Sequence, residues 1–405
     1  MQRHVFEDVK IAGFVYAGVG TLTMKTFAEH GATTVRIESM KRPDNVRLAP
    51  PWKDDVVNVN GSFLFDIVNN DRLSVGLNMN HPRALEVAQM LVRWADVVVD
   101  NFRPGTIAKW GLSYEDIKKL RPDIIMISTS LFGNTGPHAD MPGYGPQLQA
   151  YAGFTNIAGR PDGRSVMVGQ SVPDFIAPTL GVTAVIAALD YRRRTGQGQY
   201  IDLSELETAI FGFTPALLDY TVNGRIQTRA GNSCHYAAPH NTYPCQGDDR
   251  WCAIAVFTDQ EWRSLCEVMG NPEWSKEARF QTLLGRKKNE ADLDRLIEEW
   301  TVNYPPEDVM AKMQEAGVAA GVVQNAEDVC EHDPQVKHRH QFWELDHPVL
   351  GRHSYLGGCF TLSKTPRELK RGSPLLGEHS EYVYKELLGM SQEEYDSYLL
   401  DGVFE

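Results

Sequence analysis

Short segments rich in β-branched residues alternate with helical segments through the first 130 residues of the chain. The β-rich segments are TTVRIE (33–38), LSVGLNM (73–79), ADVVVD (95–100) and DIIMIS (123–128). Between them apolar residues recur three and four positions apart, as in MKTFAEHGA (24–32) and PRALEVAQMLVRWA (82–95). Such alternation predicts right-handed βαβ units, and therefore a Rossmann-like α/β domain built around a mostly parallel sheet.

The length of the chain predicts more than one domain. With 405 residues it exceeds the size at which one hydrophobic core stops growing. Residues 221–250 are rich in turn-forming residues and predict a crossover into a new unit. We expect a large domain over 1–220 and a smaller α+β domain over 221–330. The segment 331–405 has too little apolar repetition for its own core, so we expect it to return to the large domain.

Composition argues against several classes of function. The chain has 40 basic and 53 acidic residues, a net charge of −13, whereas a nucleic-acid-binding protein normally carries a basic surplus. Its six cysteines form no CxxC pair, so we expect free thiols. No 18 consecutive residues are apolar, and MQRHVFEDVKIAGF (1–14) lacks the apolar core of a signal peptide. These features predict a cytoplasmic protein with neither nucleic acid nor membrane as a partner.

One acid stands at the start of a strongly apolar stretch. In GQSVPDFIAP (169–178), Asp174 lies between a Gly/Ser/Pro turn and a broad apolar face. That face comprises Phe175, Ile176, Leu180, Val182, Val185, Ile186 and Leu189. The spacing predicts a long helix that begins at Asp174, with Pro178 in its first turn, where a proline is tolerated.

Three roles are open to Asp174 from its position. As an N-cap, its side chain would accept the free N–H groups of the helix. A metal ligand is disfavoured, because no His/Asp/Glu cluster of ligand spacing accompanies it. As a nucleophile, its carboxylate would attack a positioned thioester, and the helix N-terminus would lower its pKa.

The N-terminal segment resembles a dinucleotide-binding fingerprint only in part. Gly18, Gly20 and the acid Glu38 at a strand end match this fingerprint, but Thr23 replaces its third glycine. A nicotinamide or flavin site is therefore the weaker interpretation of this segment.

The segment DNFRPGTIAKWGL (100–112) follows a predicted strand, and ligands bind at the carboxyl ends of strands in open α/β sheets. Arg103 and Lys109 are candidates to bind phosphates, with Phe102 or Trp110 flanking an adenine ring. The alternative is a solvated turn with ordinary surface cations.

Four stretches taken in order resemble the class III CoA-transferases, the group that includes formyl-CoA:oxalate and carnitine CoA-transferases. They are AGVGTLTMKTFAEHGATTVRIES (17–39), NNDRLSVGLNM (69–79), DNFRPGTIAKWGL (100–112) and VPDFIAPTLGVTAVIAALDYRRRTGQGQYIDLSE (172–205). The resemblance continues to PLLGEH (374–379) and so covers nearly the whole chain. It implies a transferase that moves CoA from an acyl-CoA donor to a carboxylic acid acceptor, with Asp174 as catalytic residue, through an aspartyl-CoA thioester.

The resemblance also implies the binding residues and the assembly. Asn101, Phe102, Lys109 and Leu77 match positions that hold CoA, and Val15 and Tyr16 match the loop beside the thioester. We add Arg103 to these from its place in the same loop. CoA enters as a thioester substrate, with no permanently bound cofactor and no metal. The implied assembly is an interlocked dimer, either a homodimer or a heteromer with a related subunit.

Departures from the family pattern narrow the range of possible substrates and reactions. Tyr16 replaces the glutamine of the oxalate enzyme, which argues against oxalate-type chemistry. Ser39 follows Glu38 where an arginine would bind phosphate, with Lys41 or Arg42 as a substitute. Tyr144 replaces the histidine of the related 2-methylacyl-CoA racemases, so a transferase is favoured over a racemase.

The C-terminal region resembles the succinyl-CoA:benzylsuccinate type. This resemblance implies succinyl-CoA as donor and benzylsuccinate, or another larger carboxylic acid, as acceptor. A non-catalytic CoA-binding partner subunit is the remaining alternative.

Overall fold

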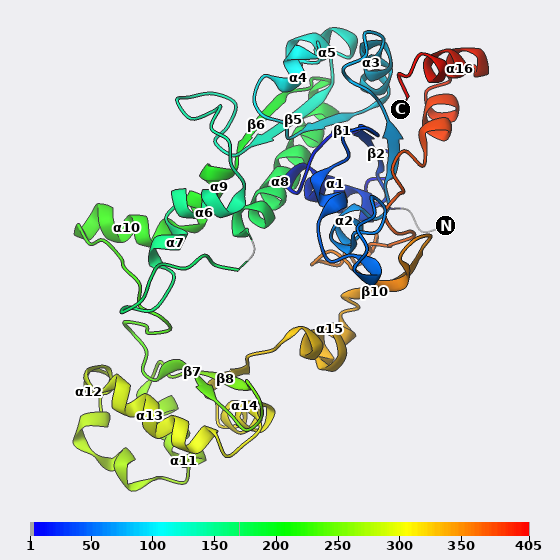
Figure 1. Cartoon of the computed structure of the whole chain (residues 1–405). Coiled ribbons are helices and arrows are strands. Elements are labelled where there is room, and N and C mark those ends of the chain that lie inside the picture. Colours follow the sequence, from blue (N-terminus) through cyan, green and yellow to red (C-terminus); the bar gives the residue numbers. More distant parts are fainter. Residues whose placement is uncertain (1–3, 170, 405) are drawn as a thin grey trace. The chain divides into compact units, whose positions relative to one another are not determined.

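The computed structural model describes residues 4–169 and 171–404. The chain divides into two compact units (Figure 1). The first contains the described residues up to 154, residues 167–225 and those from 337 onward. The second contains residues 155–166 and 226–336.

The first unit is built on a six-stranded sheet in which all five strand pairs are parallel. The strand order is β3-β2-β1-β4-β5-β6, which is that of a doubly wound dinucleotide-binding fold. The predicted Rossmann-like α/β class is therefore confirmed. The strands are β1 (Lys10–Phe14), β2 (Thr33–Glu38), β3 (Leu73–Gly76), β4 (Val97–Asp100), β5 (Ile125–Ser130) and β6 (Tyr200–Ser204).

Helices lie against the sheet and between the loops at its edge. They are α1 (Val19–Glu29), α2 (Phe63–Asn69), α3 (Ala84–Trp94), α4 (Thr106–Lys109), α5 (Tyr114–Leu120), α6 (Gly145–Tyr151), α8 (Val172–Thr195), α9 (Glu205–Gly212), α10 (Thr214–Asn223) and α16 (Gln392–Leu400). Shorter helical turns are η1 (Asn45–Leu48), η2 (Lys53–Asp55) and η6 (Tyr382–Leu387). Two further helices, α7 (Phe154–Ile157) and α15 (Pro334–His338), span the points where the chain passes from one unit to the other.

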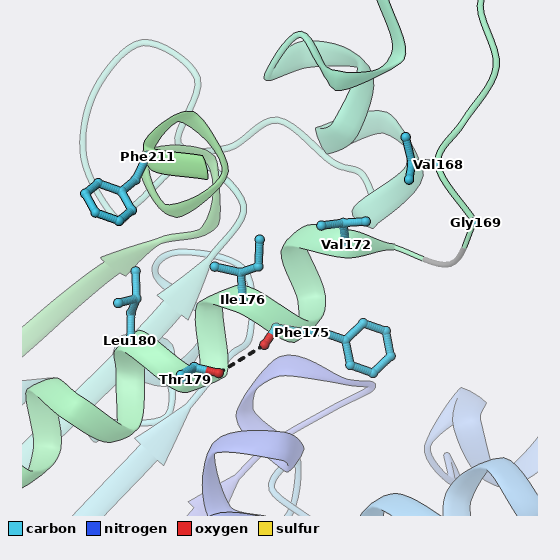
Figure 2. A pocket seen from close by; sticks show the side chains of 8 residues that line it. All are labelled: Val168, Gly169, Val172, Phe175, Ile176, Thr179, Leu180 and Phe211. Atoms are coloured by element: carbon cyan, nitrogen blue, oxygen red, sulfur yellow. Dashed lines mark hydrogen bonds between the residues drawn. The ribbon is translucent and has the colours of Figure 1, made fainter. Parts of the chain in front are cut away.

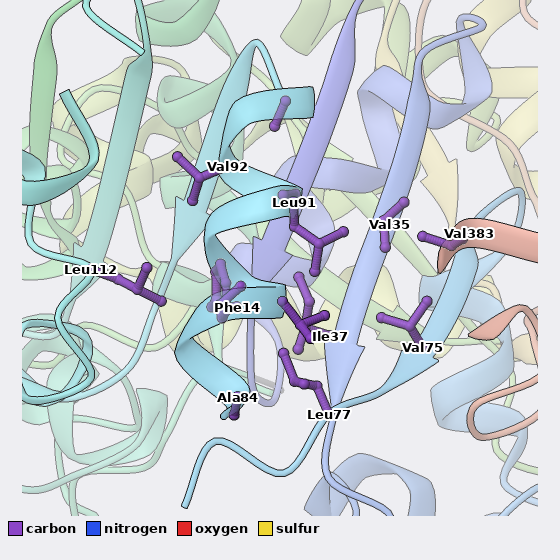
Figure 3. Close-up of a cluster of buried hydrophobic side chains, with 14 of the residues drawn as sticks. Phe14, Val35, Ile37, Val75, Leu77, Ala84, Leu91, Val92, Leu112 and Val383 are labelled. Carbon is purple, nitrogen blue, oxygen red and sulfur yellow. The ribbon is translucent and has the colours of Figure 1, made fainter. Parts of the chain in front are cut away.

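Both faces of the sheet are buried, because successive side chains of a strand point to opposite faces. In β4, Val98 joins one core cluster with residues of α3, whereas Val97 and Val99 join another with residues of α1 and α8. Figure 3 shows the first cluster, in which Leu91 of α3 lies beside Val35 and Ile37 of β2. Buried strands of this kind explain the continuous apolar runs in the sequence.

The C-terminal residues complete this first core cluster. Val383 and Tyr384 of η6, Tyr398 of α16, and Val403 and Phe404 are all less than 10% exposed and pack in the same cluster as β2 and β3. Before them, β10 (Phe342–His347) and β11 (Gly351–Leu356) form an antiparallel hairpin.

The long helix α8 begins earlier than the sequence predicted. Ser171 is its N-cap, so Asp174 lies inside the first turn, and Pro178 lies beyond that turn, within the helix. The predicted helix start and the N-cap role of Asp174 are therefore wrong. Although no run of consecutive apolar residues is long enough to span a membrane, α8 as a whole has the length and composition to do so. Only 44% of that stretch is buried, and one side of α8 packs against α1 and β5.

The second unit has a three-stranded antiparallel sheet in the order β7-β8-β9. Its core combines this sheet with α11, α13 and α14, and Cys252, Leu265, Leu293 and Val309 are fully buried there. All six cysteines of the chain are free thiols. The elements are β7 (His240–Pro244), β8 (Trp251–Ala255), β9 (Ala319–Val322), α11 (Asp259–Val268), η3 (Glu273–Lys276), η4 (Ala278–Phe280), α12 (Leu283–Lys288), α13 (Glu290–Thr301), α14 (Pro306–Glu315) and η5 (Asp328–His332).

Candidate active site

A pocket of about 410 Å³ lies within the first unit, where strands β1, β4, β5 and β6 end. Residues that follow each of these strands line it, and α8 adds Asp174. The carboxyl edge of a parallel sheet is the usual ligand site of this fold. The lining residues used below are Tyr16, Asn101, Phe102, Arg103, Tyr144, Gly145, Asp174 and Glu205.

Asp174 is held by the first turn of α8. Its backbone N–H donates to the carbonyl oxygen of Ser171 at 3.2 Å. Four residues later stands Pro178, which has no N–H to donate to the Asp174 carbonyl. The proline therefore removes one helical hydrogen bond at Asp174 itself.

Gly145, the first residue of α6, leaves room for the Asp174 carboxylate. A Cβ atom at Gly145 would lie 2.5 Å from Oδ1 of Asp174 and would also overlap the side chain of Ser171. Only glycine fits this approach, because a real Cβ contact is never so short.

Glu205 is the second acid of the pocket and the first residue of α9. It is 5% exposed, and its side chain is hydrogen-bonded to that of Asp174. Burial, together with the negative charge of Asp174, raises the pKa of Glu205 to about 8. At neutral pH this coupled pair therefore holds one proton, and burial together with the charge of Asp174 favours its position on Glu205.

Burial also raises the pKa of Asp174, whereas the neighbouring side chains of Ser171 and Glu205 lower it by less. The sequence-based expectation that the helix N-terminus lowers this pKa is thus wrong in direction. Desolvation of a carboxylate in this pocket outweighs the attraction of the helix end.

Asn101 joins the N-terminal loop to the end of β4. Its Oδ1 accepts the N–H of Tyr16 at 2.8 Å, and its Nδ2 donates to the Tyr16 carbonyl at 2.6 Å. The next N–H, that of Ala17, donates to Oδ2 of Asp44 at 2.8 Å, and Arg36 binds the same carboxylate. These bonds hold Ala17 at a φ of 57°, a left-handed conformation that is rare for alanine.

A second pocket of about 320 Å³ shares Tyr16 and Phe102 with the first. Its lining includes Val15, Leu77, Trp110, Arg42 and Asn78. The ring centroids of Phe102 and Trp110 lie 5.1 Å apart, edge to face, so aromatic surface and Arg42 line the same space.

Glu38 also borders this second pocket, but its carboxylate is already bound. Arg47 donates to both oxygens at 2.9 and 2.8 Å, and Ser74 donates at 2.8 Å. Burial alone would raise the pKa of Glu38, but Arg36 and Arg47 outweigh it and hold the value at about 2. An acid that binds a nucleotide ribose must be free to accept from it, so this arrangement disfavours the nicotinamide interpretation.

The residues predicted from sequence fall into three groups. Asp174, Tyr16, Asn101, Phe102 and Arg103 line the first pocket. Val15 and Leu77 line the second. Lys109 is exposed on α4 and belongs to the lining of neither pocket. Arg103 donates to the Asp140 carbonyl at 2.7 Å.

Glu205 and Gly145 also line the first pocket but are not among the residues predicted from the sequence. Glu205 directly follows Ser204, the N-cap of α9, and this position at the end of a strand was the available signal. Within the part of the chain that the structure describes, no three His, Cys, Asp or Glu side chains are grouped to hold a metal ion.

A parallel α/β sheet with a ligand pocket and an acid pair at its carboxyl edge defines an enzyme site of the Rossmann-like class. The profile described as "CoA-transferase family III" matches residues 6–380, and the chain belongs to this family. It is an enzyme, a CoA-transferase that transfers CoA between carboxylic acids.

Three curated relatives and one solved structure illustrate the similarity. The succinyl-CoA–D-citramalate CoA-transferase of Chloroflexus aurantiacus is 30% identical over 96% of this chain and 95% of its own length. The succinate–glutarate CoA-transferase of Agrobacterium fabrum is 30% identical over 89% and 90%. The succinyl-CoA:mesaconate CoA-transferase of Haloarcula marismortui is 30% identical over 92% and 94%. The crystal structure of a CAIB/BAIF family protein from Brucella suis has a TM-score of 0.86 and 28% identity, covering 95% of this chain and 100% of that one.

Proposed function

We propose that the enzyme moves CoA from succinyl-CoA to a carboxylic acid through a thioester on Asp174. The observation that carries the proposal is the position of Asp174 at the carboxyl edge of the sheet, in a pocket that adjoins one lined by aromatic side chains and arginine. CoA enters as a substrate, and no resident cofactor is needed. We place the reaction in the cytoplasm, since both substrates are charged and soluble.

The proposed reaction is a double displacement. A carboxylate oxygen of Asp174 attacks the donor thioester carbonyl, and CoA leaves as thiolate, giving a mixed anhydride. The thiolate then attacks the aspartyl carbonyl carbon, and the donor acid leaves, giving aspartyl-CoA. The acceptor carboxylate repeats these steps in reverse order and leaves as its CoA ester. One thioester replaces another, so no ATP is consumed.

In our proposal, the binding energy of CoA positions the reacting groups for these steps. We assign the reactive end of CoA to the first pocket and its nucleotide part to the second. Val15, Tyr16, Leu77, Asn101 and Phe102 would contact CoA, with Arg103 and Lys109 near its phosphates. Contacts remote from the thioester stabilise the transition state by fixing the carbonyl next to Asp174.

For the acceptor we propose a dicarboxylic acid. The named relatives act on citramalate, glutarate and mesaconate, all of them dicarboxylates. Tyr16, Met141 and Tyr144 bring large apolar side chains to the lining of the Asp174 pocket. We therefore propose a larger acceptor such as benzylsuccinate, with its ring against these side chains.

Mass spectrometry after incubation with succinyl-CoA and hydroxylamine tests the covalent step. The native enzyme should carry a hydroxamate on Asp174, and Asp174→Asn should abolish CoA exchange. Asp190→Asn, on the exposed part of the same helix, is the matched control and should exchange CoA at the native rate. Turnover by Asp174→Asn, after deamidation has been excluded, would refute the aspartyl thioester. A screen of carboxylic acids with succinyl-CoA then identifies the acceptor.

We also propose that two copies of the chain associate through the apolar surface around α8, α9 and α10. A pocket of about 570 Å³ on this surface is lined by apolar side chains from α8 and α9, including Phe175 and Phe211 (Figure 2). Phe175 is 57% exposed, Phe211 73% and Val222 of α10 76%, which is costly for an isolated chain in water. A second copy would cover them, as in the interlocked dimer that the family resemblance implies.

Light scattering tests this assembly. The native chain should have twice the mass of one copy, and Phe211→Asp should shift it toward a single copy. Leu400→Asp, at an even more exposed position on α16, is the control and should leave the mass unchanged. If the native chain is monomeric alone but gains mass when a related subunit is added, the assembly is a heteromer and not a homodimer.

A further inference from the structure

The proposed reaction passes twice through a tetrahedral centre built on Asp174. When CoA thiolate attacks the aspartyl carbonyl of the anhydride, the electron pair of that C=O bond moves onto the Asp174 oxygen. The same oxygen carries the charge when the acceptor carboxylate attacks aspartyl-CoA. A hydrogen-bond donor aimed at this oxygen would stabilise both tetrahedral states more than the starting carboxylate, whose charge is shared between two oxygens.

The structure places one acid next to the Asp174 carboxyl group. Glu205 lines the same pocket as Asp174, is nine-tenths buried or more, and shares a hydrogen bond with it. Between two carboxyl groups such a bond requires one proton. Helices α8 and α9, which hold the two acids, pack against each other, so the contact is set by the fold.

The burial of Glu205 also favours its neutral form. Its Oε2 is buried and has no hydrogen-bond partner among the described residues. An ionised carboxylate with a buried, unpaired oxygen would be strongly disfavoured, whereas a neutral acid tolerates that position at lower cost.

Few other charged groups face Glu205. Helices α8 and α6 pack against α9. The titratable side chain of α8 near Glu205 is Asp174, and the only titratable side chain of α6 is Tyr151. The other titratable side chains of α8 lie at least about 24 Å from Asp174 along the helix axis, at 1.5 Å per residue. They are Asp190, Tyr191 and three arginines. The pocket itself adds Tyr16, Arg103 and Tyr144.

We propose that Glu205 stays protonated and donates its O–H to the Asp174 oxygen that becomes the aspartyl carbonyl oxygen. The inference rests on the proposed aspartyl thioester and assigns Glu205 as a second catalytic residue of it. The proton remains on Glu205 throughout, and only the hydrogen bond strengthens as charge develops. The other Asp174 oxygen stays available for attack on the donor thioester.

Three variants test the role of the donor. Glu205→Gln retains an N–H donor, Glu205→Met removes the donor at similar volume, and Glu207→Gln alters an exposed glutamate of the same helix as control. Loss of an oxyanion donor typically lowers kcat by about 10²–10³-fold, so we expect this loss for Glu205→Met. Glu205→Gln should stay within about tenfold of the native kcat, a smaller loss than that for the missing donor.

The pH profile separates this role from a structural one. In the native enzyme kcat should fall as pH rises through the region near 8, because Glu205 then loses its proton. In Glu205→Gln this alkaline decline should be absent. A native kcat in Glu205→Met would overturn the inference. So would an unchanged alkaline decline in Glu205→Gln.

Infrared difference spectroscopy gives a readout that needs no turnover. At pH 7 the native protein should show the C=O band of a protonated carboxylic acid that is missing from Glu205→Gln. Absence of this band refutes a protonated Glu205 even if the Asp174 hydroxamate forms. If the band is present but no hydroxamate forms, the proposed covalent route fails instead, and the catalytic role of Glu205 fails with it.

Discussion

Carboxyl groups at the edge of the parallel sheet differ in pKa because their neighbours differ. Glu38 lies between two arginines, and its pKa is held at about 2. Asp100, at the end of β4, is buried with only neutral donors, and its pKa is raised to about 6. Glu205 is buried beside another acid, and its pKa rises to about 8. Burial is thus common to all three, and the charge of the nearest partner decides the outcome.

Asp100→Asn should stabilise the protein at alkaline pH. Burial raises the folded pKa of Asp100 to about 6, above the unfolded value of about 3.9, although the Phe102 N–H and the Ser128 hydroxyl lower it. The stability contributed by the bound proton is complete below pH 3.9 and is lost as pH rises through 6. At pH 8 the ionised acid costs on the order of 3 kcal/mol, which asparagine avoids.

Urea unfolding of native protein and Asp100→Asn at pH 4 and pH 8 checks this sign. The variant should match the native protein at pH 4 and exceed it at pH 8. A variant that loses stability equally at both values would show that the acid oxygens are needed for their hydrogen bonds.

Gly145→Ala should damage catalysis without unfolding the protein. The new methyl group would overlap the Ser171 side chain and the Asp174 carboxylate and displace both. Misplacing a reacting group by about 1 Å can lower the rate by about 10²-fold, which we expect for kcat here. Gly321→Ala, where an added Cβ meets nothing within 4 Å, is the control and should keep native kcat. Full activity of Gly145→Ala would show that Asp174 is not held in this position for the reaction.

Several residues predicted for the site follow strands of the first sheet, and the structure brings them to one pocket. Tyr16, Asn101, Phe102 and Arg103 all line the Asp174 pocket, because the fold class places strand ends together. Their contacts with CoA stay predictions. The pairing of Asp174 with Glu205 joins two helices, and no local sequence pattern indicates that acids on separate helices share a proton.

At the scale of elements, the loop Val15–Ala17 is fixed by three separate segments. Asn101 after β4 holds Tyr16 by two bonds, Asp44 before η1 holds Ala17, and Arg36 of β2 holds Asp44. Because Tyr16 lines both pockets, this network determines where they join.

Asn101→Ala should release this loop and weaken binding of acyl-CoA. Loss of two hydrogen bonds to the loop backbone, at about 1 kcal/mol each, corresponds to roughly a thirtyfold rise in KM, with a smaller change in kcat. Steady-state kinetics with succinyl-CoA measures both constants. Asn303→Ala, an exposed position of the second unit, is the control and should leave KM unchanged. An unchanged KM in Asn101→Ala would mean that the loop keeps its place without these bonds.

The alternation of strands and helices in the first 130 residues was predicted correctly because periods of two and of three to four residues are local properties. The start of α8 was not. Ser171 is the N-cap, three residues before Asp174. Two prolines obscure this helix start in the sequence. Pro173 favours a first helical turn at its own position, whereas Pro178 is tolerated inside the helix because of its tertiary surroundings.

At the scale of the molecule, distant parts of the chain build the core of the first unit. The ring of Phe404 stacks on that of Tyr384 with centroids 4.1 Å apart, and both are buried among residues of the sheet. The N–H of Asn78, just after β3, also donates to the Val403 carbonyl at 2.9 Å. Val403 and Phe404 therefore form part of the folded core of the first unit.

Phe404→Ala should lower the free energy of unfolding by about 3 kcal/mol, because it opens a cavity in this aromatic cluster. Leu400→Ala removes an apolar side chain four residues earlier, but Leu400 is 86% exposed, so this control should change stability by less than about 0.5 kcal/mol. Urea denaturation followed by tryptophan fluorescence compares the two variants. If both unfold at the native midpoint, the C-terminal segment contributes no stability to the first unit. A shift confined to Phe404→Ala, by contrast, would show that the sheet and the end of the chain unfold together.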